Sequence, residues 1–405
     1  MRTWTLAPFL AVSAAACSAQ QSGAPGAAQP EPAWRAQERD LLRDPVQITF
    51  PDRYAKAGEA YFSPDGRWII FQAIPRPAEG QSPSPHYAMF VARLRADATG
   101  KPIAIEDPIR VSREGAANTC GYFHPRTPWR IIFGSTITLP AEDQPAGYQR
   151  STSRYRWQFP AEMEVVTRIV PEVFQDARSR GLADDRDDWA EEDLEAAPLF
   201  ARPGYDAECA FSPDGRHIVY SHVDPQTKDA DLFVFDTLKN VHLPLITAQG
   251  YDGGPFFSPD GALVCFRSDR AGNDLLQVYI AVLTFADDGS ITGTRAERAV
   301  TSNEHVNWAP FWDISGEFLV YSTSEMGHDN YEVFASEVPV GASSEKKPGD
   351  LRRKRITHAP GFDGLPAFSN YGRYFMWTSQ RGPKLPDEQR PSSQIWIART
   401  GDIAP

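Results

Sequence analysis

Residues 250–270 read Gly-Tyr-Asp-Gly-Gly-Pro-Phe-Phe-Ser-Pro-Asp-Gly-Ala-Leu-Val-Cys-Phe-Arg-Ser-Asp-Arg, and this stretch is the clearest copy of a unit that repeats along the chain. Phe256 and Phe257 favour a pleated, half-buried strand. The Ser-Pro-Asp-Gly that follows has turn chemistry: proline presets φ, aspartate bonds its own backbone, and glycine accepts a positive φ. Residues 263–266 are apolar again. The stretch therefore predicts a strand, a tight turn and a second strand.

The same unit recurs along the chain. Phe-Ser-Pro-Asp-Gly is repeated at 62–66 and 211–215, and three weaker copies lie at 123–127, 312–316 and 368–372. In every repeat except the last, two more strands follow the hairpin. A full repeat therefore has four strands, which is the pattern of propeller blades. The sixth repeat has only three strands, whereas an unpaired strand near 46–49 precedes the first repeat. Pairing the two closes a ring and removes exposed edges.

The sequence thus predicts an all-β fold: a six-bladed β-propeller over residues 44–400, built of four-stranded antiparallel blades. The N-terminal strand completes the last blade. An insertion at about 137–198 interrupts the second repeat and is expected to hold its third strand near 163–169. The acidic end of this insertion, residues 184–195, does not fit an EF-hand loop, because Arg186 replaces an oxygen ligand and Trp189 replaces the glycine. It is interpreted as a solvated helix or loop.

The N-terminus has the composition of a targeting segment. Residues 1–17 combine a positive start, a short apolar run and Ala-Ala-Ala-Cys, which predicts a signal peptide. Two interpretations stay open: an ordinary secretory signal, or a lipoprotein signal with lipid on Cys17. Residues 18–43 are predicted to be a flexible tether. The expected location is the periplasm or cell envelope, with the chain anchored to the outer membrane if Cys17 carries lipid.

Charge and hydropathy limit the partners. The chain has 41 Lys and Arg against 53 Asp and Glu, a net charge of −12, which argues against a nucleic-acid partner. No later stretch is long and apolar enough to span a bilayer, so a lipid anchor is the one membrane contact expected. Cys120 and Cys209 fall at similar points of adjacent repeats and are expected either to pair or to stay reduced, and Cys265 is expected to be buried.

Aligning the repeats on their turns reveals a polar column ahead of the first strand of each blade, where the central channel opens. We expect these side chains to form a ligand-binding ring at the channel mouth, suited to Ca²⁺, another divalent cation, or a peptide or sugar. The alternative is that Asp and Asn bond their own backbone in repeated turns. The candidate residues are Asn118, Asp206, Asp252, Asn307 and Asp363, with Glu59 and Glu208 from the column two residues further on.

Motifs for catalysis are absent from the sequence. There is no Gly-x-Ser-x-Gly, no phosphate loop, no dinucleotide fingerprint and no His-Glu-x-x-His. Arg270 and Arg381 follow second strands at similar points and are candidates for contacting an acidic ligand.

The repeated Phe-Ser-Pro-Asp-Gly at 62, 211 and 257, the Tyr-Asp-Gly-Gly-Pro at 251 and the Ile-Thr endings of the blades resemble the propeller of the TolB-like family of bacterial periplasmic proteins. The resemblance covers residues 44–398. TolB itself has an N-terminal α/β domain before its propeller, and only a short tether precedes the blades here. The resemblance implies the propeller fold and says less about activity.

Two functions remain open at this point. The first is an exported, monomeric, non-enzymatic binding or scaffold protein, with an envelope protein, peptide or glycan as partner at the channel mouth. The second is a metal-dependent polysaccharide lyase or hydrolase that uses the channel. No certain cofactor is implied.

Overall fold

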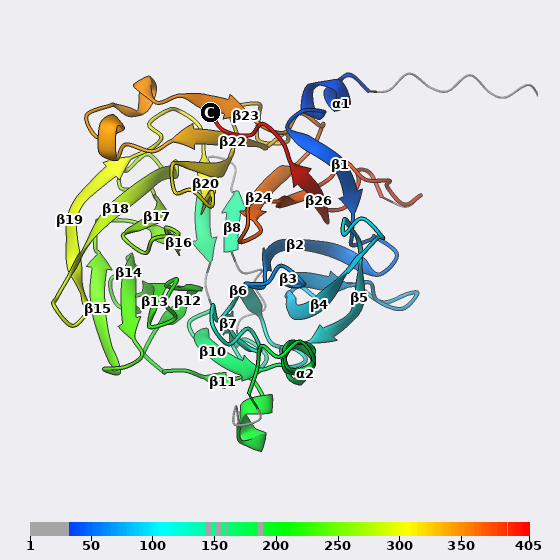
Figure 1. Ribbon diagram of the computed structural model, residues 1–405, viewed down its shortest axis with the longest axis horizontal. Helices are drawn as coiled ribbons and strands as arrows, with labels where there is room; N and C mark the ends of the chain where they lie inside the picture. The colour runs from blue at the N-terminus through cyan, green and yellow to red at the C-terminus, as the bar shows by residue number, and fades with distance from the viewer. Residues whose placement is uncertain (1–31, 142–146, 151–154, 159, 185–188, 387) are drawn as a thin grey trace, which may run out of the picture.

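The computed structural model describes residues 32–141, 147–150, 155–158, 160–184, 189–386 and 388–405. Six four-stranded antiparallel sheets surround a central axis (Figure 1), so the predicted six-bladed propeller is confirmed. In each repeat the first strand lies innermost, next to the central axis, and a tight hairpin joins it to the second strand. Cys17 and the predicted signal peptide lie outside the described residues.

The strands of the first three blades are β2 (Tyr54–Phe62), β3 (Trp68–Pro75), β4 (Ala88–Ala96) and β5 (Pro102–Arg110); β6 (Asn118–Phe123), β7 (Arg130–Ser135), β10 (Glu164–Ile169) and β11 (Ala197–Pro198); and β12 (Tyr205–Phe211), β13 (His217–Val223), β14 (Ala230–Asp236) and β15 (Val241–Ile246). The fourth and fifth blades hold β16 (Asp252–Phe257), β17 (Leu263–Ser268), β18 (Gln277–Phe285) and β19 (Ile291–Ala299), then β20 (Asn307–Trp312), β21 (Phe318–Thr323), β22 (Glu332–Glu337) and β23 (Arg353–Arg355).

The repeated turn owes its residues to a local hydrogen-bond network. In blade 4, Ser258 Oγ donates to Asp260 Oδ1 at 2.5 Å and accepts from the amide of Leu263 at 2.9 Å. Gly261 has φ of 71°, a conformation that glycine adopts at little cost. Ser63 and Asp65 make the same contact in blade 1, at 2.6 Å. The motif therefore shapes the hairpin, as its residue types predict.

The sixth blade joins the two ends of the propeller. Its order is β1 (Leu42–Gln47), β26 (Gln394–Thr400), β25 (Tyr374–Ser379) and β24 (Asp363–Phe368), and β1 runs beside β26 in Figure 1. This confirms the closure expected from the missing strand. Among the described residues, secondary structure begins before residue 44, because Ala33–Glu38 form helix α1 and β1 starts at Leu42. The predicted tether of 18–43 is therefore too long at its C-terminal end.

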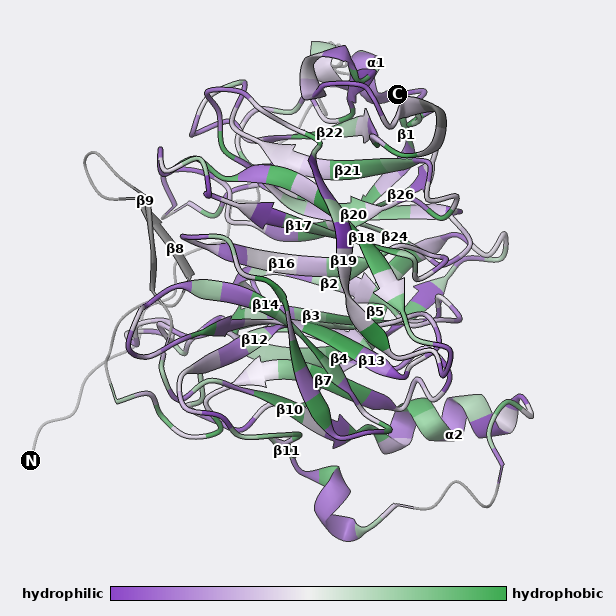
Figure 2. Cartoon of the chain, turned by 90° about the vertical axis from the view of Figure 1, so that its left-hand side faces the viewer, coloured by the Kyte–Doolittle hydropathy of each residue, from purple (hydrophilic) through white to green (hydrophobic). Residues whose placement is uncertain are grey.

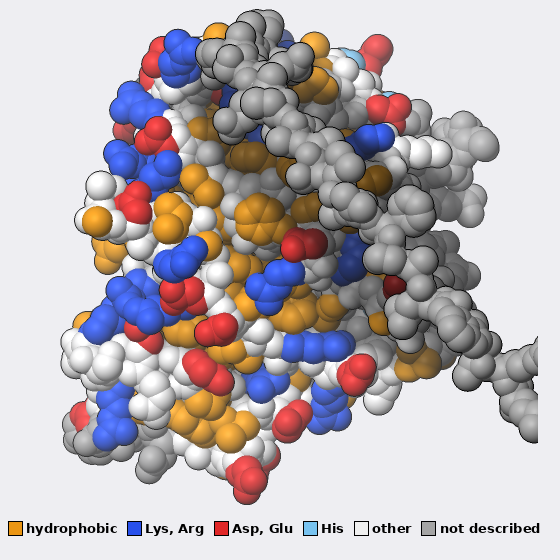
Figure 3. Space-filling view, turned by 90° about the vertical axis from the view of Figure 1, so that its right-hand side faces the viewer, with side chains coloured by type: hydrophobic (Ala, Val, Ile, Leu, Met, Phe, Trp, Pro, Cys, Tyr) orange, Lys and Arg blue, Asp and Glu red, His pale blue; other side chains and the backbone are white. Residues whose placement is uncertain are grey.

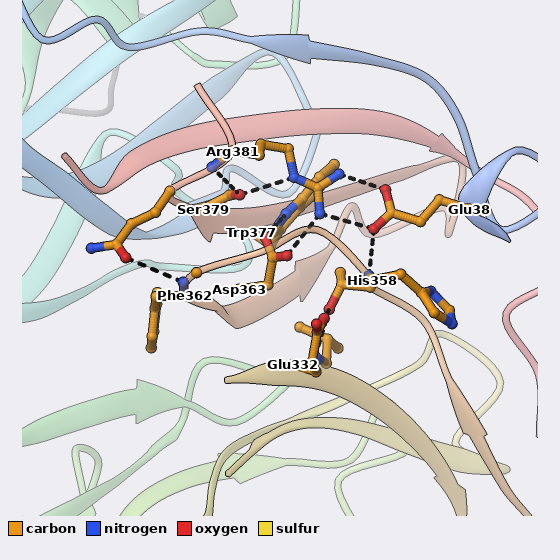
Figure 4. A network of polar contacts seen from close by, with 12 residues as sticks. Glu38, Glu332, His358, Phe362, Asp363, Trp377, Ser379 and Arg381 are labelled. Carbon is orange, nitrogen blue, oxygen red and sulfur yellow. Dashed lines mark hydrogen bonds and ion pairs between the residues drawn. The ribbon is translucent and has the colours of Figure 1, made fainter. Parts of the chain in front are cut away.

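A buried ion network fastens α1 to blade 6 (Figure 4). The Arg381 guanidinium contacts Glu38 Oε2 at 2.6 Å and Asp363 Oδ2 at 2.9 Å, and all three side chains are 3% exposed or less. Glu38 Oε1 also accepts the amide of His358 at 2.6 Å. The same guanidinium lies over the indole of Trp34 in α1, with its Cζ 5.0 Å from the ring centroid. We call Glu38, Asp363 and Arg381 the closure triad.

The insertion in blade 2 adds elements at both faces of the ring. β7 ends at Ser135, opposite Asn118 at the start of β6, and the hairpin β8 (Gly147–Arg150) and β9 (Tyr155–Gln158) follows from that face. In Figure 2 α2 (Pro171–Ser179) lies at the lower right, beside the sheets. The third strand expected near 163–169 is confirmed as β10. Part of the acidic run lies outside the described residues, and the short helix η1 (Glu191–Leu194) occupies the rest.

Other sequence expectations concern the cysteines and the membrane. Cys120, Cys209 and Cys265 are all free thiols, so the disulfide alternative for the first two is not formed. Among the described residues, no helix has both the length and the apolar character needed to cross a bilayer. The outer side shown in Figure 3 carries Lys and Arg interspersed with Asp and Glu.

Candidate functional site

A deep pocket occupies one end of the central channel. Its volume is about 1270 Å³, and it opens at the face where the first strands begin, opposite the Ser-Pro-Asp-Gly turns. All six blades contribute to its wall. One lining residue from each, in blade order, is Tyr87, Asn118, Tyr205, Arg267, Trp308 and Thr378.

Aromatic side chains close the channel below this pocket. Tyr61 of blade 1 lies 5.3 Å from Phe256 of blade 4 and 5.8 Å from Phe311 of blade 5, measured between ring centroids. Tyr122 of blade 2 lies 5.7 Å from Tyr61. Blades 1 and 4 stand on opposite sides of a six-membered ring, so rings this close fill the channel between them. The pocket is therefore blind.

A ring of β-bulges forms the floor between the pocket and these aromatic residues. Every innermost strand shifts register at the same point, which leaves one residue without a partner on the second strand. This residue has a positive φ, between 46° and 58°, in all six blades. The six bulge residues are Glu59, Cys120, Glu208, Gly254, Ala309 and Leu365.

At three of the six bulges, in blades 1, 4 and 6, the backbone amide donates to a side chain of the preceding blade. The amide of Leu365 donates to Ser322 Oγ of the preceding blade at 3.0 Å, and the amide of Gly254 donates to Glu208 Oε2 at 2.6 Å. A bulge residue has lost its ladder partner, so its amide needs another acceptor when it is buried. The conformation is thus stabilised between blades as well as within them, which explains how residues other than glycine are held at positive φ.

Glu208 is a fully paired carboxylate. It accepts from Arg267 at 2.7 Å and from the Tyr251 hydroxyl at 2.8 and 2.9 Å, besides the amide of Gly254. Burial alone would lower the pKa of Arg267, but the charge of Glu208 and the contact with Tyr251 outweigh it and raise that pKa above its ordinary value. Arg267 therefore stays charged, and Glu208 acts as its buried counter-ion.

Glu59 differs from Glu208 although it occupies the same position in its blade. It is half-buried, and its Oε1 accepts from the Cys120 thiol at 2.9 Å and from the Tyr61 hydroxyl at 3.5 Å. In the part of the chain that the structure describes, no Lys, Arg or His side chain lies within salt-bridge distance of it. Burial raises the pKa of Glu59, and the contact with Cys120 and the charge of Arg267 offset this only in part.

Most residues of the first polar column do not lie at the channel mouth, where they were expected. Asp206 contacts His222 Nδ1 at 2.7 Å, and Asp252 contacts Arg270 at 3.0 Å. Asn307 donates to Gln277 Oε1 at 3.0 Å. These residues are buried between strands and do not line the pocket, and neither does Asp363 of the closure triad. The structure thus places these four residues in contacts that join strands through other side chains, whereas the local alternative expected bonds to their own backbone.

Three of the seven candidate site residues do line the pocket, namely Glu59, Asn118 and Glu208. The two loop arginines do not face an acidic ligand. Arg270 pairs with Asp252, and Arg381 pairs with the two carboxylates of the closure triad. Among the described residues, no three His, Cys, Asp or Glu side chains are grouped to hold a metal ion. The cation ring expected from the column is therefore not assembled there.

Sequence reasoning missed the aromatic and cationic parts of the wall. Trp308, Tyr331 and Phe362 lie within 6.3 Å of one another by ring centroids and line the pocket on the side of blades 5 and 6. Arg267 lies within the stretch that decides the fold, but an arginine in a second strand gives no indication that it faces a channel. The bulge ring was also missed, because only one of its six positive-φ residues, Gly254, is a glycine.

Comparison with known proteins gives structural similarity alone. No protein-family model matches the chain, and a search of curated proteins gives no match. Similar solved structures include the putative TolB from Agrobacterium tumefaciens, at 14% identity and TM-score 0.49, covering 88% of this chain and 96% of that one. TolB from Acinetobacter baumannii matches at 14% identity and TM-score 0.47, over 84% of this chain and 65% of that one, slightly less than two thirds of its length. An oligogalacturonate lyase from Vibrio parahaemolyticus matches at 10% identity and TM-score 0.44, over 89% and 96%. TolB structures thus stand among the similar folds, as the sequence resemblance leads one to expect, while the six-bladed architecture itself rests on the strand pairing described above.

Proposed function

We propose that this protein is an exported, non-enzymatic binding protein whose channel pocket takes a segment of an envelope protein, a peptide or a glycan. The observation that carries the proposal is the blind pocket, with aromatic residues on one side and polar residues on its floor. Its volume of about 1270 Å³ exceeds the roughly 300–1,000 Å³ of ordinary small-molecule pockets. A chain segment with several residues or sugar rings fits such a space.

The chemistry of the pocket favours binding over catalysis. Cys120 is the one thiol on its lining among the described residues, and burial together with the charges of Glu59 and Glu208 raises its pKa well above the ordinary range. Such a thiol holds its proton and is a poor nucleophile. A metal-dependent lyase or hydrolase would need a ligand set, and the carboxylates expected to supply one are engaged in strand contacts. Nothing specific in the pocket favours that second function.

The binding proposal is tested with arrays of peptides and oligosaccharides and with two matched variants. Trp308→Ala removes a large part of the pocket wall. Leu238→Ala is the control, because Leu238 is 77% exposed in a turn and does not line the pocket. We expect Trp308→Ala to lose the bound class and Leu238→Ala to keep it. Equal binding by both variants, or cleavage of a bound probe detected by mass spectrometry, would contradict the proposal.

Export and anchoring form a separate part of the proposal, supported by the composition of residues 1–17. We expect the native chain to fractionate with the envelope membrane and Cys17→Ser to move to the soluble envelope fraction, because the lipid would have no attachment site. A variant that stays in the membrane fraction would exclude lipid on Cys17. Size-exclusion chromatography with light scattering tests the expected monomer.

A further inference from the structure

The floor of the pocket holds two carboxylates but only one guanidinium. Glu208 takes up Arg267, as its 2.7 Å contact shows, and has further donors from Tyr251 and Gly254. Glu59 has two weak donors, a thiol and a hydroxyl at 3.5 Å, both on Oε1. Across the described residues its Oε2 receives no hydrogen bond. The floor is therefore one positive charge short, at a position that lines the pocket.

Other acceptors on the same side of the pocket also lack donors. Asn118 is 4% exposed, and its Nδ2 donates to the carbonyls of Tyr87 and Ala116 at 2.8 Å, which fixes the orientation of the amide. Its Oδ1 is buried and receives no hydrogen bond from any described residue. Gln72 Oε1 is in the same condition, and both residues line the pocket. Buried acceptors of this kind are seldom left without a partner, so the missing partner is expected to bring donors.

The opposite wall suits an apolar group. Trp308, Tyr331 and Phe362 form one aromatic cluster there, with centroid distances of 5.9 to 6.3 Å. Aromatic faces attract cations and pack against apolar side chains. A ligand that fills both sides therefore has a donor-rich cation beside blades 1 and 2 and an apolar portion beside blades 5 and 6.

We propose that Glu59, on a side of the pocket where Asn118 Oδ1 and Gln72 Oε1 also lack donors, is the counter-ion for a primary ammonium group of a bound peptide. An ammonium carries three N–H donors and one positive charge, which matches what the floor lacks. Two sources share this chemistry: the amino terminus of the peptide and a lysine side chain. The inference rests on the proposed binding function and narrows it to one class of ligand end.

The test uses the full chain and three sets of synthetic probes. The first is a pool of tripeptide amides X-Gly-Gly with a free amino terminus, where X is each amino acid in turn. The second is the same pool with acetylated amino termini and lysine omitted at X. The third is acetyl-Gly-Lys-Gly amide, which carries an ammonium on the side chain alone. Native mass spectrometry identifies bound members, and calorimetry measures their affinities for wild type, Glu59→Gln and Glu317→Gln.

We expect the free-amine pool to yield ligands that bind wild type at least about tenfold more tightly than their acetylated forms. Glu59→Gln keeps the shape of the side chain and removes its charge, so it should lose this preference. Glu317→Gln makes the same substitution at an exposed residue that does not line the pocket and should stay within about twofold of wild type. Glu59-dependent binding of the lysine probe would assign the ammonium to a side chain.

Two results would overturn the inference. The first contradicts only the ammonium role of Glu59, and the second also contradicts peptide binding. If peptides bind equally well with free and acetylated ends, or if Glu59→Gln binds as wild type does, the ammonium role is wrong while peptide binding remains. If no probe of any pool binds wild type, the ammonium role fails with it, and the array experiment then decides for glycans. The comparison of free and acetylated probes needs only wild type, so it holds even if Glu59→Gln folds poorly.

Discussion

Replacing Arg381 by methionine tests how the ring is held closed. The guanidinium is 1% exposed and serves two carboxylates, Glu38 and Asp363, which are 3% and 1% exposed. After the change Glu38 keeps the amide of His358, and Asp363 keeps the indole of Trp377 and the side chain of Ser379. Removing one partner of a buried pair costs about 3–5 kcal/mol, and two stranded carboxylates place Arg381→Met toward the upper end of that range.

The cost should depend on pH in a defined direction. Burial raises the pKa of Asp363 to about 6 from its ordinary 3.8, so the native state takes up a proton there before the unfolded state does. Acidification from pH 8 to pH 5 therefore neutralises the stranded Asp363 carboxyl in the variant and relieves its penalty. Urea unfolding monitored by tryptophan fluorescence at both pH values measures this, and the loss of stability should be smaller at pH 5.

A matched control exists in blade 4. Arg270 contacts Ser268 and Asp252 as Arg381 contacts Ser379 and Asp363, but it is 21% exposed and lies away from the closing strand. Arg270→Met should cost less, about 1.5–3 kcal/mol. Hydrogen exchange of the β1 amides should accelerate in Arg381→Met and stay unchanged in the control. A stability loss below about 1 kcal/mol at pH 8, or unaltered exchange of β1, would refute the role given to the closure triad.

Three further outcomes follow from the structure. Burial raises the pKa of Glu332 to about 8 from 4.5, so stability should fall as pH rises between these values, and Glu332→Gln should remove that fall in urea midpoints compared at pH 5 and pH 8.5. Tyr61→Ala should lower the free energy of unfolding by about 3 kcal/mol or more, because it removes the ring that meets three others across the channel, and a loss below half of this would contradict the closed channel. Gly254→Ala should destabilise the protein, since its φ is 58° and an added Cβ would lie 2.7 Å from Arg267, whereas Ala309→Gly at φ of 50° should be neutral or stabilising by up to about 1 kcal/mol in thermal melts.

The sequence contained the architecture in its local chemistry. Ser258, Asp260 and Gly261 determine a hairpin through contacts within a few residues, so their repetition could be read directly as blades. The missing outer strand of the sixth repeat implied the pairing of β1 with β26, which the structure confirms. Expectations of this kind succeed because the turn and the strand count depend on residues close together in the chain.

The direction of the channel side chains depended on more distant partners. Asp252 and Asp363 were expected at the mouth, but each found an arginine two residues beyond its blade's second strand. The alignment placed Glu59 and Glu208 at the channel, but no consistent residue type at 59, 120 or 309 marks a bulge, so the conformation of the floor could not be predicted from the sequence. Glu38 was assigned to a tether because its partner Arg381 is 343 positions away.

Closure by β1 also constrains the order of folding. Leu42 pairs with Thr400, so blade 6 holds the longest-range strand contact in the propeller. Contacts between distant segments form late, because the entropy of closing a long loop must be overcome first. A chain that emerges from its N-terminal side can build blades 1 to 5 one after another, while β1 waits without a partner until β26 appears. During that interval the waiting strand is an exposed edge, and the time to complete synthesis or translocation sets how long it stays open to pairing with another chain.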